Sequence, residues 1–390
     1  MKRIAILVFT ICFSLFLGLV ALGTLLRAGV GTSFFENRTL AEPPALSRAG
    51  LWTGDYFDQW ETWFTDHALG RSAALKANTW LELRLLRLPV VGDVVVTEDC
   101  LLGRNGFNRW DTGYLPAWSA DWAAMLADLG DYIGEWGGEL LFVGLPEQTT
   151  YFLDKYPDYL ENRAWYLEPE RKAVFAAMEA AGVSALDMSA VFAAQGRPED
   201  YYARSDHHFT YAGALATREA ILDKLAEDFA LDLPRPAIRR ETLPNPFLGS
   251  RNRKLSGLWP SEDRLEIGYA DVPFRRWDNG AEVEATLYDL PASPEETVTY
   301  EVYMGGDKGE TILRTDRPEL PSALIFGDSF TNALETMLYA SFDETRSLDL
   351  RYYNKMSLRE YLDIFRPEVV IYVRDETTYF SYEGNGAVGD

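Results

Sequence analysis

The pattern of apolar and polar residues begins with an uncharged run over residues 4–26, directly after Lys2 and Arg3. As a helix, this run is long enough to cross about 30 Å of hydrocarbon. The positive charges before it favour a cytoplasmic N-terminus. We therefore predict a membrane anchor over residues 1–27, with the rest of the chain outside the cytoplasm. A cleaved signal peptide, cut near residues 21–23, is the alternative.

The second stretch, residues 28–93, combines a linker with a helical region. Residues 28–50 contain glycine, asparagine and a proline pair with little periodicity, which is typical of a linker. Residues 51–89 have apolar side chains three and four positions apart, which predicts helices. We interpret their aromatic stripe as a face packed against the domain, although an exposed stripe would suit stacking on sugars. The stripe consists of Trp52, Tyr56, Trp60, Trp63 and Phe64. His67 falls at a break, where we expect a capping or buried hydrogen-bonding role.

From residue 94 onward, strand-like and helix-like segments alternate, which predicts a parallel sheet covered by helices on both faces, an α/β fold. The predicted strands are 94–96, 139–146, 183–188, 322–326, 346–350 and 368–373. The predicted helices are 115–136, 168–181, 210–229 with Thr210 as N-cap, 331–340 and 357–365. Residues 232–318 break this alternation. Their prolines and the alternating stretches 282–288 and 297–304 predict antiparallel strands. We treat them as a β-rich insertion in one domain, residues 94–390, whose tail at 383–387 should be frayed.

Composition narrows the classes of partner. The chain has a formal net charge of −23, so it should repel nucleic acid and anionic headgroups. A neutral substrate, or one handled locally by arginines, fits better. Cys12 lies in the apolar run and Cys100 far outside it, so we predict no disulfide and no thiolate metal cluster. We expect no cofactor.

The first candidate for chemistry is Ser329. The apolar residues 323–326 predict a strand that ends in Gly327-Asp328-Ser329, and a helical segment follows. Ligands of open α/β sheets bind at the carboxyl ends of strands. A serine at such a turn lies near free backbone amides that can stabilise an oxyanion. Gly-Asp-Ser alone is common, and a simple turn with a helix cap would produce the same pattern.

The second candidate is the segment Asp206-His207-His208, which holds two of the three histidines in the chain. Asp206 can orient the His208 ring while the other ring nitrogen faces a serine hydroxyl. His207 could take the same part by geometry alone. Alternatively, Asp206 caps a helix and both histidines pack or face solvent. We do not expect a metal site, because neighbouring residues rarely coordinate one ion together and no second metal-binding motif exists.

Taken together, these segments resemble the DHHW family, with Phe209 where tryptophan is usual. The resemblance covers most of the chain beyond the anchor. It is carried by residues 205–210 with 212–214, 326–330, 36–41, 66–71, 349–353 and 367–371. That family is similar to the SGNH-hydrolase-like proteins that O-acetylate bacterial exopolysaccharides such as alginate.

The resemblance implies a flavodoxin-like, three-layer α/β/α sandwich, with the acid–histidine block ahead of the serine, permuted relative to ordinary SGNH esterases. It implies Ser329 as nucleophile, His208 as base and Asp206 as its orienter. His207 and Asp328 would have supporting roles. Two positions for the oxyanion hole, Gly305 and Asn332, are guesses.

We therefore predict a membrane-tethered acyltransferase or esterase outside the cytoplasm that acts on O-acetyl groups of a cell-envelope polysaccharide or exopolysaccharide. The sequence does not decide between transfer and hydrolysis. A transferase would need a membrane partner to pass it the acyl group, because acetyl-CoA is cytosolic. The alternatives are a non-catalytic carbohydrate-binding protein with the same fold and an envelope assembly protein that binds through its N-terminal helices.

Overall fold

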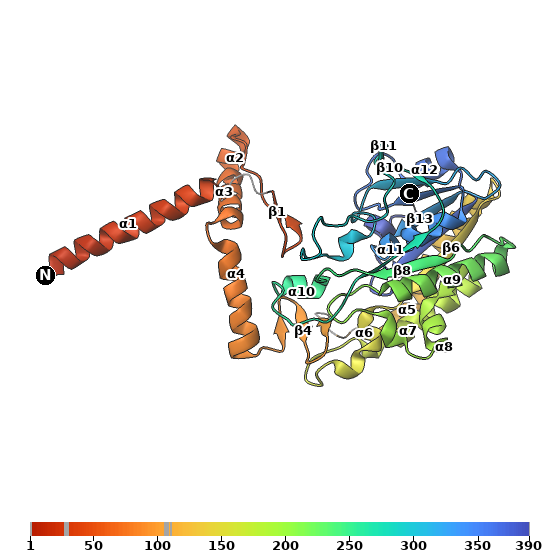
Figure 1. Ribbon diagram of the computed structural model, residues 1–390, viewed down its shortest axis with the longest axis horizontal. Coiled ribbons are helices and arrows are strands. Elements are labelled where there is room, and N and C mark those ends of the chain that lie inside the picture. Colours follow the sequence, from red (N-terminus) through yellow and green to blue (C-terminus); the bar gives the residue numbers. More distant parts are fainter. Residues whose placement is uncertain (1, 27–30, 105–108, 110, 390) are drawn as a thin grey trace. The chain divides into compact units, whose positions relative to one another are not determined.

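The computed structural model describes residues 2–26, 31–104, 109 and 111–389 (Figure 1). The chain divides into two compact units. Unit 1 comprises residues 1–94 and 252–260, and unit 2 comprises residues 95–251 and 261–390. The predicted domain boundaries remain a prediction.

The apolar run forms one helix in unit 1, α1 (Lys2–Leu26), as predicted. Its mean hydropathy reaches 2.8, and its 25 residues span about 37 Å at ~1.5 Å per residue. A membrane span and a signal sequence both have these properties. Arg27 and residues 28–30, where the predicted anchor meets the linker, lie outside the described residues.

The rest of unit 1 is helical with short strands, as the periodicity of residues 51–89 predicted. The strands are β1 (Thr32–Ser33), β2 (Arg38–Thr39) and β3 (Val90–Val91), and β4 (Val94–Val96) begins at the end of the unit. The helices are α2 (Arg48–Thr53), α3 (Asp55–His67), α4 (Arg71–Trp80) and the π-helical η1 (Leu81–Leu86). Gly54 and Gly70 separate α2, α3 and α4 with positive φ angles of 93° and 81°, a conformation that glycine adopts readily.

Unit 2 is built on an eight-stranded mixed sheet with the order β11-β10-β12-β14-β13-β15-β6-β7. The five strands from β14 to β7 are parallel, and β10, β11 and β12 extend one edge with antiparallel pairs. The parallel strands are β6 (Glu139–Leu145), β7 (Ser184–Asp187), β13 (Ala323–Gly327), β14 (Glu344–Leu348) and β15 (Val369–Asp375). The antiparallel strands are β10 (Arg275–Asp278), β11 (Ala281–Val283) and β12 (Glu310–Arg314).

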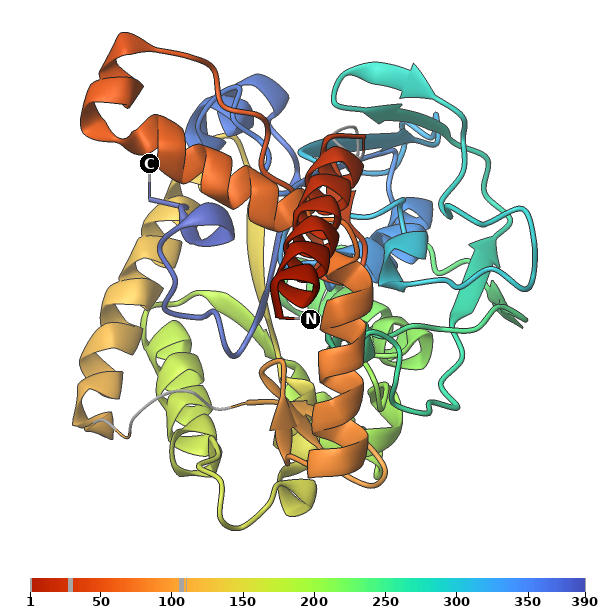
Figure 2. The same cartoon turned by 90° about the vertical axis from the view of Figure 1, so that its left-hand side faces the viewer.

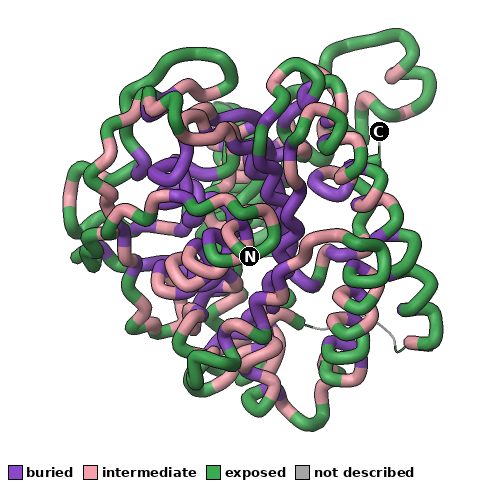
Figure 3. The backbone as a smooth tube through the Cα atoms, turned by 90° about the vertical axis from the view of Figure 1, so that its right-hand side faces the viewer, coloured by how far each residue is buried: buried purple, intermediate pink, exposed green. Residues whose placement is uncertain are grey.

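Helices cover both faces of this sheet. On one face, Leu140, Phe142, Leu324 and Phe326 pack in a core with α5 (Leu115–Gly134), α7 (Ala164–Ala180) and α12 (Leu358–Phe365). The opposite face contacts α8 (Met188–Ala194), α9 (Tyr211–Phe229) and α11 (Thr331–Leu338). Successive strand residues point to opposite faces, so the central strands are buried on both sides and appear purple in Figure 3. The predicted three-layer α/β/α architecture is confirmed.

The remaining elements of unit 2 are short. They are β5 (Leu101–Gly103), η2 (Thr112–Tyr114), α6 (Gln148–Tyr151), η3 (Leu153–Lys155), η4 (Pro198–Tyr201), β8 (Ile238–Thr242), β9 (Glu266–Ala270), η5 (Tyr300–Val302), η6 (Tyr339–Ser341) and η7 (Gly384–Gly386). A further helix, α10 (Ser250–Lys254), begins in unit 2. The predicted N-cap is confirmed, because the Thr210 side chain accepts a hydrogen bond from Gly213 N at 3.3 Å.

Residues 232–318 contain antiparallel strands, but not all where they were predicted. The stretch 282–288 is a strand only as far as Val283, and the strand predicted at 297–304 is wrong. Thr299 instead caps the short helix η5, accepting a hydrogen bond from Glu301 N at 3.4 Å. The alternation there reflects burial of Tyr300 and Val302 within a turn.

The prediction of a frayed tail is also wrong. Asn385 is 2 % exposed. Its amide donates to Gly327 O at 2.5 Å, and its own carbonyl accepts from Tyr372 Oη at 2.8 Å. The glycine and asparagine residues of the tail show no hydrophobic periodicity, so no pattern predicted an ordered tail. In the structure, the Asn385 amide donates to a buried carbonyl at the end of β13, and leaving this carbonyl unpaired would be energetically costly.

Gly327 gives a first testable prediction. Its φ is +151°, and a Cβ there would lie 1.9 Å from Val373 O of the neighbouring strand. We expect Gly327→Ala to lower the free energy of unfolding by about 3 kcal/mol or more, because the two strands would have to separate. Chemical denaturation measures this. Gly134→Ala, where a Cβ meets nothing within 4 Å, should change stability by less than about 1 kcal/mol, and equal effects would contradict the argument.

Candidate active site

Ser329 lies at the carboxyl end of β13, in the turn that leads into α11. Strand pairing places Gly327 beside Val373 of β15, so the turn begins at the centre of the parallel sheet. Residues 327–330 connect directly to the first turn of α11. Ser329 is half-buried, so part of the residue stays accessible.

The structure brings Ser329 together with His208 and Asp206, more than a hundred positions earlier in the chain. The His208 ring lies 2.7 Å from Ser329 Oγ through Nε2 and 2.7 Å from Asp206 Oδ1 through Nδ1. Asp206 Oδ1 also accepts from the backbone N of His208 at 3.0 Å. Hydroxyl, imidazole and carboxylate therefore form one continuous hydrogen-bonded relay.

The surroundings of Asp206 keep it charged. Its side chain is 1 % exposed. Burial acts most strongly and raises the pKa of its carboxyl, but the attraction of His208, its hydrogen bonds and the attraction of His207 together lower the pKa below the ordinary value. A permanently ionised Asp206 can orient the His208 ring and stabilise its protonated form.

Ser250, which the sequence did not single out, completes the support of Asp206. Its backbone N donates to Asp206 Oδ2 at 2.6 Å, and its hydroxyl donates to Asp206 Oδ1 at 3.1 Å. The same hydroxyl lies 2.7 Å from His207 Nδ1. His207 is therefore held beside the relay, and its side chain is 41 % exposed. The preceding Gly249 lets the two segments approach closely, because a Cβ there would lie 2.4 Å from Ser205 O.

Aromatic rings fix the plane of the His208 imidazole. Tyr300 stacks on it with ring centroids 3.7 Å apart and an angle of 3°, and Phe330 meets it edge-on at 5.0 Å. Phe209, the residue that departs from the family pattern, packs on Phe330 at 5.0 Å. Burial holds the pKa of the Tyr300 hydroxyl well above its ordinary value, so this ring is a neutral packing surface.

Asp328 is bound away from the relay. Its carboxylate accepts from Thr378 Oγ1 at 2.8 Å and from Asp375 N at 3.2 Å, and it lies 3.4 Å from Arg374 Nε. It ties the turn at Ser329 to the end of β15. We therefore assign Asp328 a supporting role through the backbone.

The two guesses for the oxyanion hole gain no support. The Asn332 amide donates to Asp307 Oδ1 at 2.8 Å. Gly305 accepts from Lys308 Nζ at 2.9 Å through its carbonyl.

His67 lies in unit 1, and its Nδ1 lies 2.9 Å from Trp63 O. It has the buried hydrogen-bonding role that was expected.

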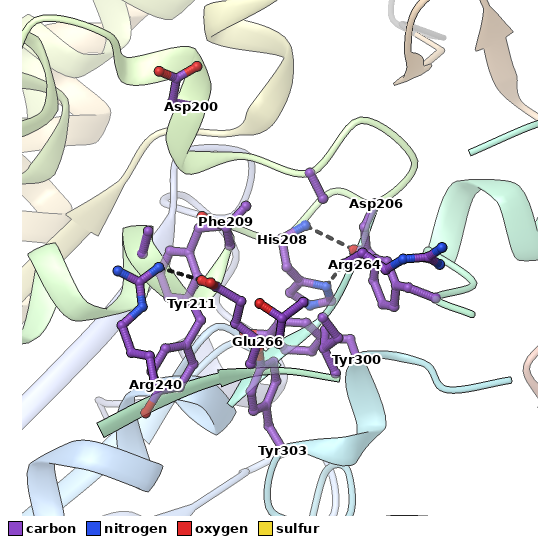
Figure 4. A pocket seen from close by; sticks show the side chains of 16 residues that line it. Asp200, Asp206, His208, Phe209, Tyr211, Arg240, Arg264, Glu266, Tyr300 and Tyr303 are labelled. Atoms are coloured by element: carbon purple, nitrogen blue, oxygen red, sulfur yellow. Dashed lines mark hydrogen bonds and ion pairs between the residues drawn. The ribbon is translucent and has the colours of Figure 1, made fainter. Parts of the chain in front are cut away.

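A cavity of about 370 Å³ lies beside Asp206 and His208. Tyr300 and Tyr303 form part of its wall, and Figure 4 shows the ion pair of Arg240 with Glu266 on one side. Polar and aromatic groups next to an activated base suit a small polar ligand.

The ligand atoms of Asp206, His207 and His208 lie within 4.8 Å of one another, but hydrogen bonds already engage the carboxylate and both rings.

Ser250 gives a second prediction. We expect Ser250→Ala to lower kcat about tenfold and leave KM unchanged, because Asp206 loses one charge-assisted hydrogen bond worth about 1.5 kcal/mol. Steady-state hydrolysis of an acetyl ester measures both constants. Ser322→Ala, at the opposite end of β13, should change neither, and a wild-type kcat for Ser250→Ala would contradict the assigned support.

Comparison with known proteins finds similarity to one family over part of the chain. Residues 107–287 match the family model described as "SGNH hydrolase-like domain, acetyltransferase AlgX". This stretch is similar to an SGNH hydrolase-like domain. It includes Asp206, His208 and Ser250, and it ends before Ser329. The predicted resemblance to SGNH-hydrolase-like proteins is confirmed. The search of curated proteins gave no match.

Solved structures support the same fold. Bacillus cereus PatB1 superposes with a TM-score of 0.61 at 19% identity, covering 74% of this chain and 99% of PatB1. A DHHW family protein from Eubacterium siraeum superposes with a TM-score of 0.55 at 17% identity, covering 75% and 93%.

Proposed function

We propose that this chain is a membrane-tethered serine acyltransferase or esterase that moves acetyl groups onto or off hydroxyls of a cell-envelope polysaccharide or exopolysaccharide outside the cytoplasm. The observation that carries the proposal is the relay with two 2.7 Å contacts, from Asp206 through His208 to Ser329. Such a relay activates a hydroxyl that would otherwise be a weak nucleophile.

In the first half-reaction, Ser329 Oγ attacks the carbonyl carbon of the acyl donor while His208 Nε2 takes the hydroxyl proton. The backbone amides of Ser329 and Phe330 stabilise the developing oxyanion. Those of Thr331 and Asn332 already donate to Asp328 O at 2.9 Å and Ser329 O at 3.2 Å. His208 then returns the proton to the leaving group, which leaves an acetyl ester on Ser329. In the second half-reaction, His208 deprotonates a sugar hydroxyl or water, which attacks this ester. A sugar gives transfer, and water gives hydrolysis.

The relatives and the N-terminus support the polysaccharide substrate and the cellular location. The matching family model is named for the acetyltransferase AlgX, and PatB1 was also solved with a sulfonyl adduct, at a TM-score of 0.60. Lys2 and Arg3 before α1 favour translocation of the residues after this helix. A transferase in that location would receive its acyl group from a membrane partner.

The test is to trap the acetyl-enzyme. The protein is incubated with 4-nitrophenyl acetate, quenched in acid and digested, and the peptide that contains Ser329 is examined by mass spectrometry. We expect one acetyl group on Ser329, and a sulfonyl fluoride should block its formation. Loss of the adduct in Ser329→Ala, with the melting curve unchanged, completes the test. An unmodified Ser329 during continued turnover would refute the proposal.

Acceptors then separate the two reactions. Envelope oligosaccharides are added during turnover, and acetate is measured both free and on the sugar. A transferase passes most acetyl groups to the sugar, whereas an esterase releases them to water at an unchanged rate.

A further inference from the structure

The helices that come after α1 in the chain expose many large apolar side chains. Within residues 46–88, twelve are exposed: Leu46, Leu51, Trp52, Phe57, Phe64, Leu69, Leu75, Trp80, Leu81, Leu85, Leu86 and Leu88. Trp52 is 94 % exposed, and no residue of α4 or η1 is buried. Figure 2 draws these helices as orange ribbons. A concentration of this kind marks an interaction surface.

Unit 2 lacks such a concentration among its described residues. Its eight exposed large apolar side chains are spread over a far longer stretch of chain: Tyr114, Trp118, Tyr159, Val283, Leu290, Tyr352, Ile364 and Tyr382. Scattered single residues of this kind are normal on a soluble surface. The apolar surface of residues 46–88 is therefore a local property of unit 1.

The position of this surface along the chain indicates what covers it. Leu69 N, in the turn between α3 and α4, donates to Thr24 Oγ1 at 3.1 Å. Thr24 is in the last turn of α1, the helix that is long and apolar enough to cross a membrane. If α1 spans the bilayer, this hydrogen bond holds the turn between α3 and α4 at the level of the membrane surface.

The distribution of charge also favours contact with a membrane. Residues 1–94 carry nine Lys and Arg against eight Asp and Glu, whereas residues 95–390 carry a formal charge of −24. Arg38 and Arg71 are already paired with Asp66 and Glu36. The surface is thus nearly neutral and apolar, which suits insertion between headgroups better than pairing with their phosphates.

We propose that residues 46–88 lie in the outer interface of the bilayer, with Trp52, Phe57, Trp80 and Leu85 inserted among the lipid headgroups. Tryptophan is enriched at this depth because its ring is amphipathic. The inference rests on the membrane tether in the proposed function. It adds that residues 46–88, which follow the tether in the chain, lie along the membrane surface as an interfacial belt.

The test measures depth with an environment-sensitive fluorophore. In the full chain carrying Cys12→Ser and Cys100→Ala, single labels are placed through Phe57→Cys, Leu85→Cys and, as a control, Ile364→Cys. Ile364 is also exposed and apolar, but it lies on α12 of unit 2. The proteins are reconstituted in phosphatidylcholine vesicles, with or without nitroxide-labelled lipid.

We expect the labels at positions 57 and 85 to shift to shorter wavelength and to lose more than half of their emission to the nitroxide lipid. High salt should not weaken this quenching. The label at position 364 should stay water-like and unquenched. Labels at 57 and 85 that match the control would overturn the proposal. A shift without quenching would also overturn it, because protein, either a second copy or the rest of this chain, would then cover the surface.

A fourth label, introduced through Phe16→Cys in α1, separates this inference from the tether itself. If position 16 is quenched and positions 57 and 85 are not, the belt is wrong and the tether stands. If position 16 is also unquenched, the membrane part of the proposed function fails with it. Melting curves of the labelled proteins exclude misfolding as the cause.

Discussion

Turnover of an activated acetyl ester by His208→Ala is expected to be about 10⁴-fold slower than by the wild type. The imidazole lies 2.7 Å from Ser329 Oγ, and in the proposed mechanism it takes the hydroxyl proton. Without it, the hydroxyl remains protonated at neutral pH and attacks poorly. Release of 4-nitrophenol in steady state measures the effect, and the acetyl group on Ser329 should fail to accumulate.

The neighbouring residue provides the control. His207→Ala removes the same side chain one position away, where the ring contacts Ser250 and lies beside His208 without reaching Ser329 in any hydrogen bond among the described residues. We expect a loss of less than about tenfold, the value of one hydrogen bond. Equal losses in both variants, or a larger loss at His207, would show that the wrong histidine has been assigned as the base.

A second large effect concerns stability at alkaline pH. Burial raises the pKa of Glu376 from 4.5 to about 8, despite hydrogen bonds from Thr150 and from Glu147 N that lower it. The folded state therefore keeps a proton on Glu376 that the unfolded state has lost above pH 4.5. Stability contributed by this group should fall between pH 4.5 and pH 8, by about 5 kcal/mol in total.

Glu376→Gln should remove this part of the pH dependence. The amide oxygen can still accept both hydrogen bonds, and no charge is buried at high pH. Denaturation in detergent at pH 5 and pH 9 should show a smaller fall for the variant than for the wild type. Glu227→Gln, at an exposed position of α9, should leave the fall unchanged. A wild-type fall in Glu376→Gln would contradict the assignment, since other buried acids such as Glu170 would then dominate.

Sequence patterns predicted the central sheet well, because the strands buried on both faces are short apolar runs bounded by helices. The helix predicted at 210–229 and the strand at 139–146 match α9 and β6 within one residue. The site residues could also be predicted, because the chain offers few alternatives. With three histidines in the chain, two of them adjacent, few residues could serve a serine. The relay geometry was not encoded in any single motif.

The features that the sequence could not provide depend on contacts between distant segments. Ser250 and Tyr300 lie in the irregular residues 232–318, where no periodicity marks a side chain that turns toward Asp206 or His208. The prediction of a frayed tail was wrong for the same reason. The hydrogen bond from the Asn385 amide to Gly327 O, which joins distant segments, holds the tail in place. Antiparallel strands β10 to β12 were expected in an insertion, yet they extend the central sheet, which only strand pairing reveals.

The placement of β15 between β13 and β6 has a consequence for biogenesis. During synthesis, β6 can pair with β7 early, but its other neighbour, β15, arrives only after the residues up to 368 have been made. The middle of the sheet stays open until residue 375 has been made. The turn at Ser329, which is bound to β15 through Asp328, therefore takes its final form only after nearly the whole chain has been made.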